Sequence, residues 1–266
     1  MKQRIITGVV AGVLFLGLCV LGGFGYPTLI MLMALVGYYE FAKMGTGAPF
    51  RAEAWIGYAG VAYLTFPWQT FGLHFPMPPQ SVFWLLLLLL LCATVLSKNE
   101  INIKQTSLLF LGIVYVGFGF YYIAASRETP DGHGLFWTFL LLLSIWGSDA
   151  GAYFTGKAFG RRKLWPAISP NKTIEGAVGG LLIAVVIALG FSLADPELLH
   201  PMRAIVLGLA ASIVGQMGDL IQSAYKRVYG IKDSGSILPG HGGILDRCDS
   251  WLAVFPIVHI LFLLPY

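Results

Sequence analysis

Long apolar segments alternate with short polar stretches along the whole chain. A helix needs roughly 20 apolar residues to cross a bilayer core of about 30 Å, and nine segments approach or reach that length. The fourth is short but dense in leucine, and the boundary between the first two falls near Gly22–Gly25. The pattern predicts an all-α fold with about nine transmembrane helices, at residues 5–24, 26–43, 55–72, 82–97, 106–126, 134–155, 175–194, 201–222 and 249–265.

The composition agrees with this pattern. Of the 266 residues, 57% are hydrophobic and 11% are charged, whereas a soluble domain carries about 25% charged residues. The composition therefore excludes an ordinary soluble domain and favours a polytopic membrane protein. Three isolated cysteines, Cys19, Cys92 and Cys248, indicate neither a disulfide framework nor a zinc site.

Lysine and arginine residues are divided unevenly between the two sides that nine alternating spans create. Fifteen fall on the side of the N-terminus, and only Arg127 and Arg203 fall on the other. Because cytoplasmic connections are enriched in these residues, we expect the N-terminus and the polar stretches 156–174 and 223–248 to face the cytoplasm, and the C-terminus to be external. An arbitrary member of the fifteen is expected only to orient its helix: Lys2, Arg4, Lys43, Arg51, Lys98, Lys104, Lys157, Arg161, Arg162, Lys163, Lys172, Lys226, Arg227, Lys232 and Arg247.

Four aspartates stand where membrane topology does not require them. Asp149 and Asp219 lie inside the sixth and eighth predicted spans, near their cytoplasmic ends, and a mid-membrane aspartate costs at least about 2.5–3.5 kcal/mol. Asp246 and Asp249 open the ninth span, with a spacing that places both on one face of a helix. Clustered oxygen ligands suit Mg²⁺, so these four residues are candidate ligands of two divalent or mixed cations. The alternative for Asp246 or Asp249 is helix capping.

Two polar stretches combine residues of distinctive chemistry at fixed spacings. One comprises residues 148–153, Gly160-Arg161 and residues 169–176. The other, within residues 223–249, contains Ser223, Lys226, Arg227, Lys232, Asp233, Pro239, His241, Gly242, Gly243, Asp246, Arg247 and Asp249. Over about residues 144–256 the chain resembles the phosphatidate cytidylyltransferase (CDP-diacylglycerol synthase) family. Cys248 and Gln222 depart from that pattern, since the family often has an aliphatic residue and a glutamate there.

The resemblance implies a nucleotidyltransferase of phospholipid biosynthesis. It would convert CTP and phosphatidate into CDP-diacylglycerol and pyrophosphate with Mg²⁺, at the cytoplasmic face of a membrane (the inner membrane in a bacterium). The expected partners are CTP, phosphatidate and membrane lipid, without nucleic acid. Residues 1–100 would form about four helices without a recognised motif, and residues 101–266 a catalytic region of about five helices.

Cationic and small residues of the two stretches suit a reaction between two phosphate-bearing anions. The attacking phosphate has a second pKa near 6, so it needs no strong base at about pH 7, and we expect His241 to form a tight turn with Gly242 and Gly243 that contacts phosphate. The expected catalytic residues are Lys226, Arg227, Lys232, Asp233, His241 and Arg247, and the expected phosphate-binding residues are Lys172, Ser169, Asn171, Gly242 and Gly243.

Local signals add two expectations about the polar stretch 156–174 and the span that follows it. Ser169-Pro170 predicts a helix N-cap followed by proline at the first helical position, which would present free amides beside Lys172. Gly176, Gly179 and Gly180 predict a small-residue face for close helix packing, either within the chain or in a homodimer.

Two other functions remain open on the sequence. Intramembrane Asp149 and Asp219 are also typical of an ion-coupled transporter, although the chain shows no inverted repeat and has an odd number of predicted spans. A cytidylyltransferase acting on another lipid phosphate, such as an isoprenoid ether lipid, would use the same phosphate and cation chemistry with a different apolar groove.

Overall fold

The computed structural model describes residues 2–265, with side chains from residue 6 onward, so the side chains of Lys2 and Arg4 lie outside the described part. The chain is mostly helical, with one two-stranded sheet. It divides into two compact units. Unit 1 comprises Met1–Ala124 and Asp233–Arg247, and unit 2 comprises Ala125–Lys232 and Cys248–Tyr266. The division into a motif-free region 1–100 and a catalytic region 101–266 stays a prediction.

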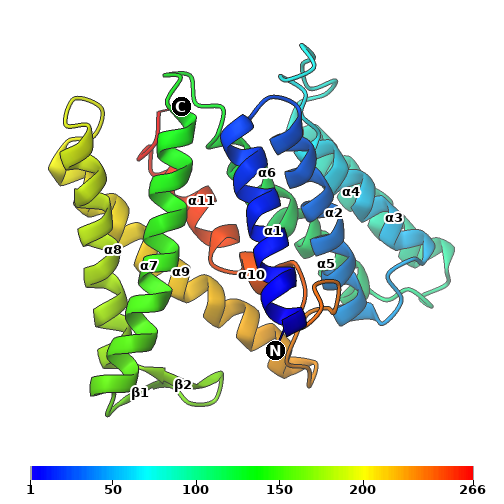
Figure 1. The fold of residues 1–266 in the computed structure, drawn as a ribbon. Coiled ribbons are helices and arrows are strands. Elements are labelled where there is room, and N and C mark those ends of the chain that lie inside the picture. The colour runs from blue at the N-terminus through cyan, green and yellow to red at the C-terminus, as the bar shows by residue number, and fades with distance from the viewer. Residues whose placement is uncertain (1, 266) are drawn as a thin grey trace. The chain divides into compact units, whose positions relative to one another are not determined.

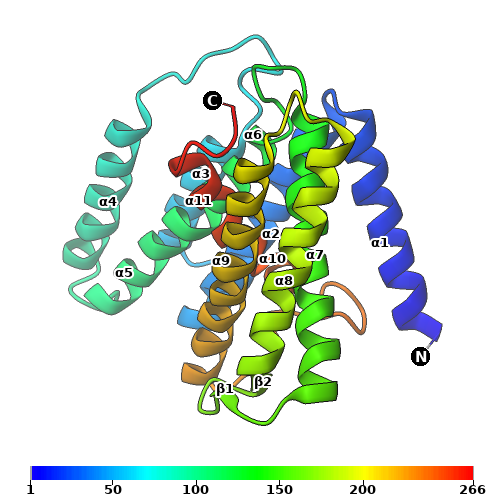
Figure 2. The same ribbon diagram turned by 90° about the vertical axis from the view of Figure 1, so that its left-hand side faces the viewer.

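Residues 223–249, which carry the second polar stretch of the family resemblance, are called the signature loop. Unit 1 contains the N-terminal helices and residues 233–247, the middle of this loop. The loop runs into the short helix α10, Leu245–Cys248. A π-helical turn, Ile113–Gly117, joins α5 and α6 into one continuous helical segment (Figures 1 and 2). The helices are α1 (Lys2–Leu21), α2 (Gly25–Thr46), α3 (Ala52–Thr65), α4 (Pro79–Leu96), α5 (Ile103–Gly112) and α6 (Phe118–Ala125).

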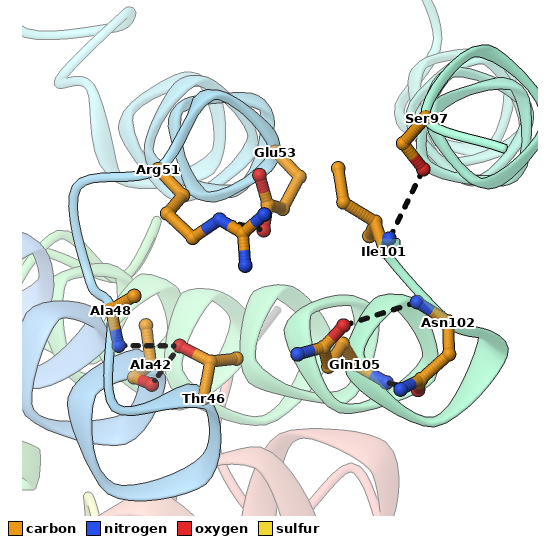
Figure 3. A network of polar contacts seen from close by, with 9 residues as sticks. All are labelled: Ala42, Thr46, Ala48, Arg51, Glu53, Ser97, Ile101, Asn102 and Gln105. Carbon is orange, nitrogen blue, oxygen red and sulfur yellow. Dashed lines mark hydrogen bonds and ion pairs between the residues drawn. The ribbon is translucent and has the colours of Figure 1, made fainter. Parts of the chain in front are cut away.

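Local polar contacts mark the end of α2 and the starts of α3 and α5 (Figure 3). Thr46 Oγ1 donates to the carbonyl of Ala42, and α2 stops at Gly47, whose φ of 70° suits glycine. The next helices begin on charged or polar side chains: Arg51 pairs with Glu53 at 3.3 Å, and Asn102 forms a capping box with Gln105.

Unit 2 is built around α7 (Gly134–Phe159), α8 (Ile174–Ala194) and α9 (Pro201–Val228), with α11 (Trp251–Ile260) also packed on α9. Strands β1 (Lys163–Trp165) and β2 (Ser169–Thr173) form an antiparallel hairpin between α7 and α8, visible at the lower end of these helices in Figure 1. Helices α7 and α8 approach so closely that a Cβ on Gly180 would lie 2.6 Å from the Ser148 carbonyl oxygen. The small-residue face of α8 is thus used within the chain.

Each predicted span overlaps a helix in the described residues, although residues 66–72 and 261–265 lie outside the helices, and five helical segments are long and apolar enough to cross a membrane. These are Pro79–Leu96, Ile103–Ala125, Gly134–Phe159, Ile174–Ala194 and Pro201–Val228. The chain is therefore a mostly helical protein with the character of a multi-pass membrane protein. Nine spans and their orientation stay predictions.

The hairpin corrects two expectations. The fold is not all-α, and Ser169-Pro170 does not start a helix, because residues Ser169–Thr173 form β2. Proline lacks an N–H donor but is tolerated in an edge strand, so Pro170 fits this position. The N-cap of α8 is Thr173, whose Oγ1 accepts the Gly176 N–H at 3.1 Å.

The prediction that Asp246 and Asp249 lie on one face of a helix is also wrong. Helix α10 ends at Cys248 and α11 begins at Trp251, so Asp249 lies in the turn between them. There its Oδ1 accepts the N–H of Ser250 at 2.8 Å. The two carboxylates therefore do not share one face of a continuous helix.

Candidate active site

A cavity of about 420 Å³ opens in unit 2 at the end of α7, α8 and α9 that carries the hairpin. Four residues that the sequence singled out lie together on its wall: Asp149, Asn171, Lys172 and Asp219. The sequence pattern gives Lys157 only a topological role and does not single out Gln216. The full lining is Asp149, Ala152, Tyr153, Gly156, Lys157, Leu164, Asn171, Lys172, Thr173, Gly176, Ala177, Gln216 and Asp219.

Asp219 is held by one partner from the hairpin and one from its own helix. Lys172 Nζ lies 2.5 Å from its Oδ2, and Ser223 Oγ donates to its Oδ1 at 3.2 Å. Both side chains of the ion pair are partly accessible, with exposed fractions of 26% for Lys172 and 31% for Asp219. In a partly exposed ion pair of this kind, either side chain can exchange its partner for a substrate or a cation at small cost.

Three carboxylates of unit 2 influence one another electrostatically. Asp149 and Asp249 are each close enough to Asp219 to be repelled by it, while Lys172 attracts Asp149 and Lys226 attracts Asp249. Three carboxyl groups thus interact with two ammonium groups. The surplus of oxygen donors fits a hard divalent cation. The described residues contain no group of three His, Cys, Asp or Glu side chains already close enough to hold a metal ion.

Hydrogen bonds to α8 and α9 fix the hairpin that carries Asn171 and Lys172. At the start of α8, the Glu175 carboxylate accepts the N–H groups of Arg161 and Arg162 at 3.1–3.3 Å. Arg227 of α9 donates from Nε to the carbonyl of Ile168 at 3.3 Å. Arg227 thus holds the hairpin, in addition to any contact with substrate.

The signature loop in unit 1 contains the tight turn that the sequence predicts. The Leu238 N–H donates to the Gly242 carbonyl at 3.0 Å, and the His241 N–H donates back to Leu238 at 2.8 Å. Gly240 and Gly242 have φ values of 76° and 83°, a region that favours glycine. The turn is confirmed, and its contact with phosphate stays a prediction.

Asp246 organises the same loop. Its Oδ2 accepts hydrogen bonds from the N–H of Ser234 at 2.8 Å, the hydroxyl of Ser234 at 3.0 Å and the N–H of Gly243 at 2.9 Å. These contacts organise the loop and are not the helix cap that the sequence left open as the alternative for Asp246.

Glu40 is a site-related residue that the sequence analysis missed. It lies in α2 with an exposed fraction of 1%, and its carboxylate accepts the N–H groups of Ile244 and Leu245 at 3.0 and 2.9 Å. One signal could have revealed it: Glu40 is the only charged residue between Tyr26 and Ala42 in an otherwise apolar helix. A carboxylate in such a segment needs polar partners.

The remaining predicted residues are divided between the units. Ser169, Lys226, Arg227, Lys232 and Asp249 belong to unit 2 but do not line the cavity. Unit 1 holds the others, namely Asp233, His241, Gly242, Gly243, Asp246 and Arg247. The structure thus brings Asp149, Asn171, Lys172 and Asp219 together at one cavity, with Asp249 in electrostatic range.

Comparison with known proteins covers almost the whole chain. The profile of the Cytidylyltransferase family matches residues 2–264. The chain belongs to this family. Phosphatidate cytidylyltransferase of Bacillus subtilis is 40% identical over 276 aligned residues, covering 99% of this chain and 98% of the relative. The enzymes of the same name from Staphylococcus saprophyticus and Staphylococcus haemolyticus are each 35% identical, over 99% of both chains.

These comparisons confirm the family indicated by the two polar stretches. They extend it to residues 2–143, where the sequence analysis saw only transmembrane character. Glu40 therefore lies within the family region, in the same unit as the middle of the signature loop. Membership also favours a nucleotidyltransferase over an ion-coupled transporter.

Proposed function

We propose that the chain transfers CMP from CTP to phosphatidate, with the cavity of unit 2 and the signature loop as its reaction machinery. The full-length similarity to phosphatidate cytidylyltransferases carries the activity. The enzyme is a nucleotidyltransferase of phospholipid biosynthesis. The Lys172–Asp219 pair at the cavity is the feature that best supports this location.

The reaction is an in-line displacement at the α-phosphorus of CTP. A phosphatidate oxygen forms the new P–O bond, the bond to the β-phosphate breaks, and pyrophosphate leaves with the electron pair. Because the attacking phosphate is largely deprotonated at about pH 7, the reaction does not need a strong base from the protein. Positioning and charge neutralisation then provide most of the catalysis.

A divalent cation, Mg²⁺ by its preference for oxygen donors, is the proposed cofactor. The proposed ligands are Asp149, Asp219 and Asp249, together with Asp246, which precedes Asp249 by three residues in the chain. The excess of carboxylates over ammonium groups in unit 2 supports this assignment. When bound, the metal would neutralise phosphate charge and orient the phosphoryl oxygens.

Basic and small residues are proposed to hold the phosphate groups of the two substrates. Lys172 would leave Asp219 for a phosphate, an exchange that the partial exposure of both side chains allows. Lys226, Lys232 and Arg247 would add positive charge, Arg227 would also keep the hairpin in place, and Asp233 would orient a basic partner. Ser169, Asn171, His241, Gly242 and Gly243 would contribute polar contacts from the hairpin and the turn.

The reaction is proposed to occur at the cytoplasmic face of the membrane. The distribution of 15 basic residues against 2 supports this orientation. The cavity also lies at the ends of long apolar helices, beside the polar hairpin, as expected for a site at the bilayer boundary.

Incorporation of radiolabelled CTP into lipid by the purified protein tests the proposal. We expect labelled CDP-diacylglycerol with phosphatidate, loss of product with a Mg²⁺ chelator, and recovery on adding Mg²⁺. An isoprenoid ether lipid phosphate serves as the comparison substrate. Faster turnover of that lipid would reassign the acceptor, and product formation in the presence of chelator would contradict the metal assignment.

A further inference from the structure

The carboxylate of Glu40 is the centre of a set of contacts that joins α2 to the signature loop within unit 1. Besides accepting the N–H groups of Ile244 and Leu245, its Oε2 lies 3.0 Å from Ser234 Oγ. The loop thus contributes two backbone donors and one hydroxyl to a single buried acid. Burying a carboxylate is costly unless it is hydrogen-bonded, and these donors supply the compensation.

The loop backbone is shaped to fit this carboxylate. A Cβ on Gly235 would overlap with Glu40 Oε1, and a Cβ on Gly243 would overlap with Glu40 Oε2. Neither glycine has a positive φ, so its backbone conformation alone does not demand glycine. At both positions the close approach of the Glu40 carboxylate is what excludes a side chain.

Ser234 connects Glu40 to Asp246. Its hydroxyl lies 3.0 Å from both Glu40 Oε2 and Asp246 Oδ2, and its N–H donates to the same oxygen of Asp246 at 2.8 Å. A hydroxyl carries one proton and donates to one carboxylate at a time, but its position is defined by both. Moving Glu40 would therefore move the groups that orient Asp246.

We propose that Glu40 is a positioning residue, which clamps residues 234–245 against α2 and so sets the orientation of Asp246 and of the turn at Gly242-Gly243. The proposal rests on the proposed function of the signature loop. Glu40 does not touch substrate in this role. It acts through Ser234, through the amides of Ile244 and Leu245, and through its close contact with Gly243.

The first test is Glu40→Gln, which keeps the size of the side chain but directs an NH₂ group at donors of the loop. We expect kcat to fall about 10²-fold, as a small misplacement of reacting groups can do, and the Mg²⁺ concentration for half-maximal activity to rise several-fold. A merely destabilised protein would lose active molecules but keep the Mg²⁺ requirement of those that remain. Activity is therefore expressed per folded protein.

Glu53→Gln is the matched control. Glu53 is also a buried acid of unit 1, with an exposed fraction of 4%, but its partner is Arg51 and not the loop. Its variant should keep the wild-type kcat and Mg²⁺ requirement. Wild-type kcat and Mg²⁺ requirement in folded Glu40→Gln would overturn the proposal, as would an equal change in Glu53→Gln.

A double-mutant cycle with Gly235 tests the contact itself. In the wild-type background Gly235→Ala should lower kcat and the melting temperature, because the new methyl meets the carboxylate. In the Glu40→Ala background the same substitution should cost little, since the space is open. If the losses in kcat and melting temperature from the two substitutions simply add, the contact between Glu40 and Gly235 does not act as proposed. If the substitutions are coupled in melting temperature but not in kcat, the contact is only structural and Glu40 is not a positioning residue.

The outcome is separable from that of the proposed function. Inactivity of the wild-type protein with CTP and phosphatidate would count against the proposed function, whereas the coupling of Glu40 with Gly235 in melting temperature would still decide whether the clamp exists. Wild-type activity that needs Mg²⁺, together with an unaltered Glu40→Gln variant, would reject the positioning role alone.

Discussion

Asp219 shows how a single residue gathers the chemistry of unit 2. Its two oxygens contact Lys172 of the hairpin and Ser223 of its own helix, and it repels the carboxylates of Asp149 and Asp249. Substitutions that remove charge beside Asp219 or at Asp246 therefore test the site directly.

Lys172→Ala should raise the apparent KM for CTP or phosphatidate about tenfold or more, because a charge-assisted contact to phosphate is lost. Steady-state kinetics with each substrate varied in turn measure the effect. Lys163→Ala, an exposed basic residue of the same hairpin that does not line the cavity, should leave both KM values unchanged. If wild type and Lys172→Ala have the same KM values for both substrates, Lys172 does not bind phosphate and serves only membrane topology.

Asp246→Asn should reduce turnover about 10²-fold or more while the protein remains folded in membranes. The amide oxygen can still accept hydrogen bonds from Ser234 and Gly243, but the charge proposed to bind a cation is gone. Turnover and elution from a sizing column in detergent measure the two effects. Full Mg²⁺-dependent activity in this variant would remove Asp246 from the metal site.

At the scale of elements, the packing of α7 on α8 depends on glycine. The Cβ of an alanine at position 180 would lie 2.6 Å from the Ser148 carbonyl oxygen, a backbone atom that cannot rotate away. At Gly190, farther along α8, a Cβ would meet no atom within 4 Å. The same substitution therefore has opposite steric consequences at two positions of one helix.

Gly180→Ala should lower the stability of the protein by about 1–3 kcal/mol, as overpacking does. Gly190→Ala should change it by about 1 kcal/mol or less, toward higher stability, because alanine favours helix. Thermal unfolding in detergent compares the two variants. Similar melting temperatures for both would show that α7 and α8 do not depend on close contact at Gly180.

The connection between α6 and α7 contains a polar cap around Asp131. Its carboxylate accepts hydrogen bonds from Thr129 Oγ1 at 2.6 Å, the His133 N–H at 3.1 Å and Trp137 Nε1 at 2.7 Å. Partial burial raises the pKa of Asp131, but the hydrogen bonds from Thr129, Trp137 and His133 outweigh it, so the pKa is lowered from its ordinary value of 3.8. The ionised form is therefore favoured by folding.

Asp131→Asn should lower the melting temperature near pH 7, and the difference from wild type should shrink as the pH falls below about 4. The sign follows from the lowered pKa: the contribution is complete above the unfolded-state value and is lost as the pH falls through the folded-state value. Melting curves of both proteins between about pH 7 and 3 measure this. If the difference in melting temperature between the two proteins does not change with pH, the negative charge of Asp131 does not contribute to stability.

At the scale of the whole molecule, the signature is divided between two units. Residues 223–232 and Asp249 belong to unit 2, whereas residues 233–247 belong to unit 1 with the N-terminal helices. The first hundred residues, which carry no recognised motif, therefore supply the support for the middle of the signature loop. Glu40 is the clearest example of this support.

The predicted membrane orientation can be tested with single cysteines in a variant that lacks Cys19, Cys92 and Cys248. His74→Cys, in the connection between α3 and α4, should react with an impermeant thiol reagent in intact cells, because that side is expected to be external. Lys163→Cys in the hairpin should react only after the membrane is opened. Labelling of both in intact cells would overturn the nine-span topology.

The sequence alone determined the helical segments and the family. Apolar runs long enough to cross a membrane give little choice of secondary structure, since backbone groups must be satisfied within the segment, and the phosphate and cation chemistry requires residue types that remain visible as a spaced pattern. Shorter polar segments were less predictable. Ser169-Pro170 has the local preferences of a helix start, but pairing with β1 made the segment a strand.

Only the tertiary structure decided which distant residues meet. Lys172 and Asp219 are 47 positions apart, and Glu40 and Leu245 are 205 apart, and no local preference encodes such pairs. Hydrogen bonding and charge compensation select them once the helices have packed, because a polar group removed from water must find its partner wherever the fold provides one.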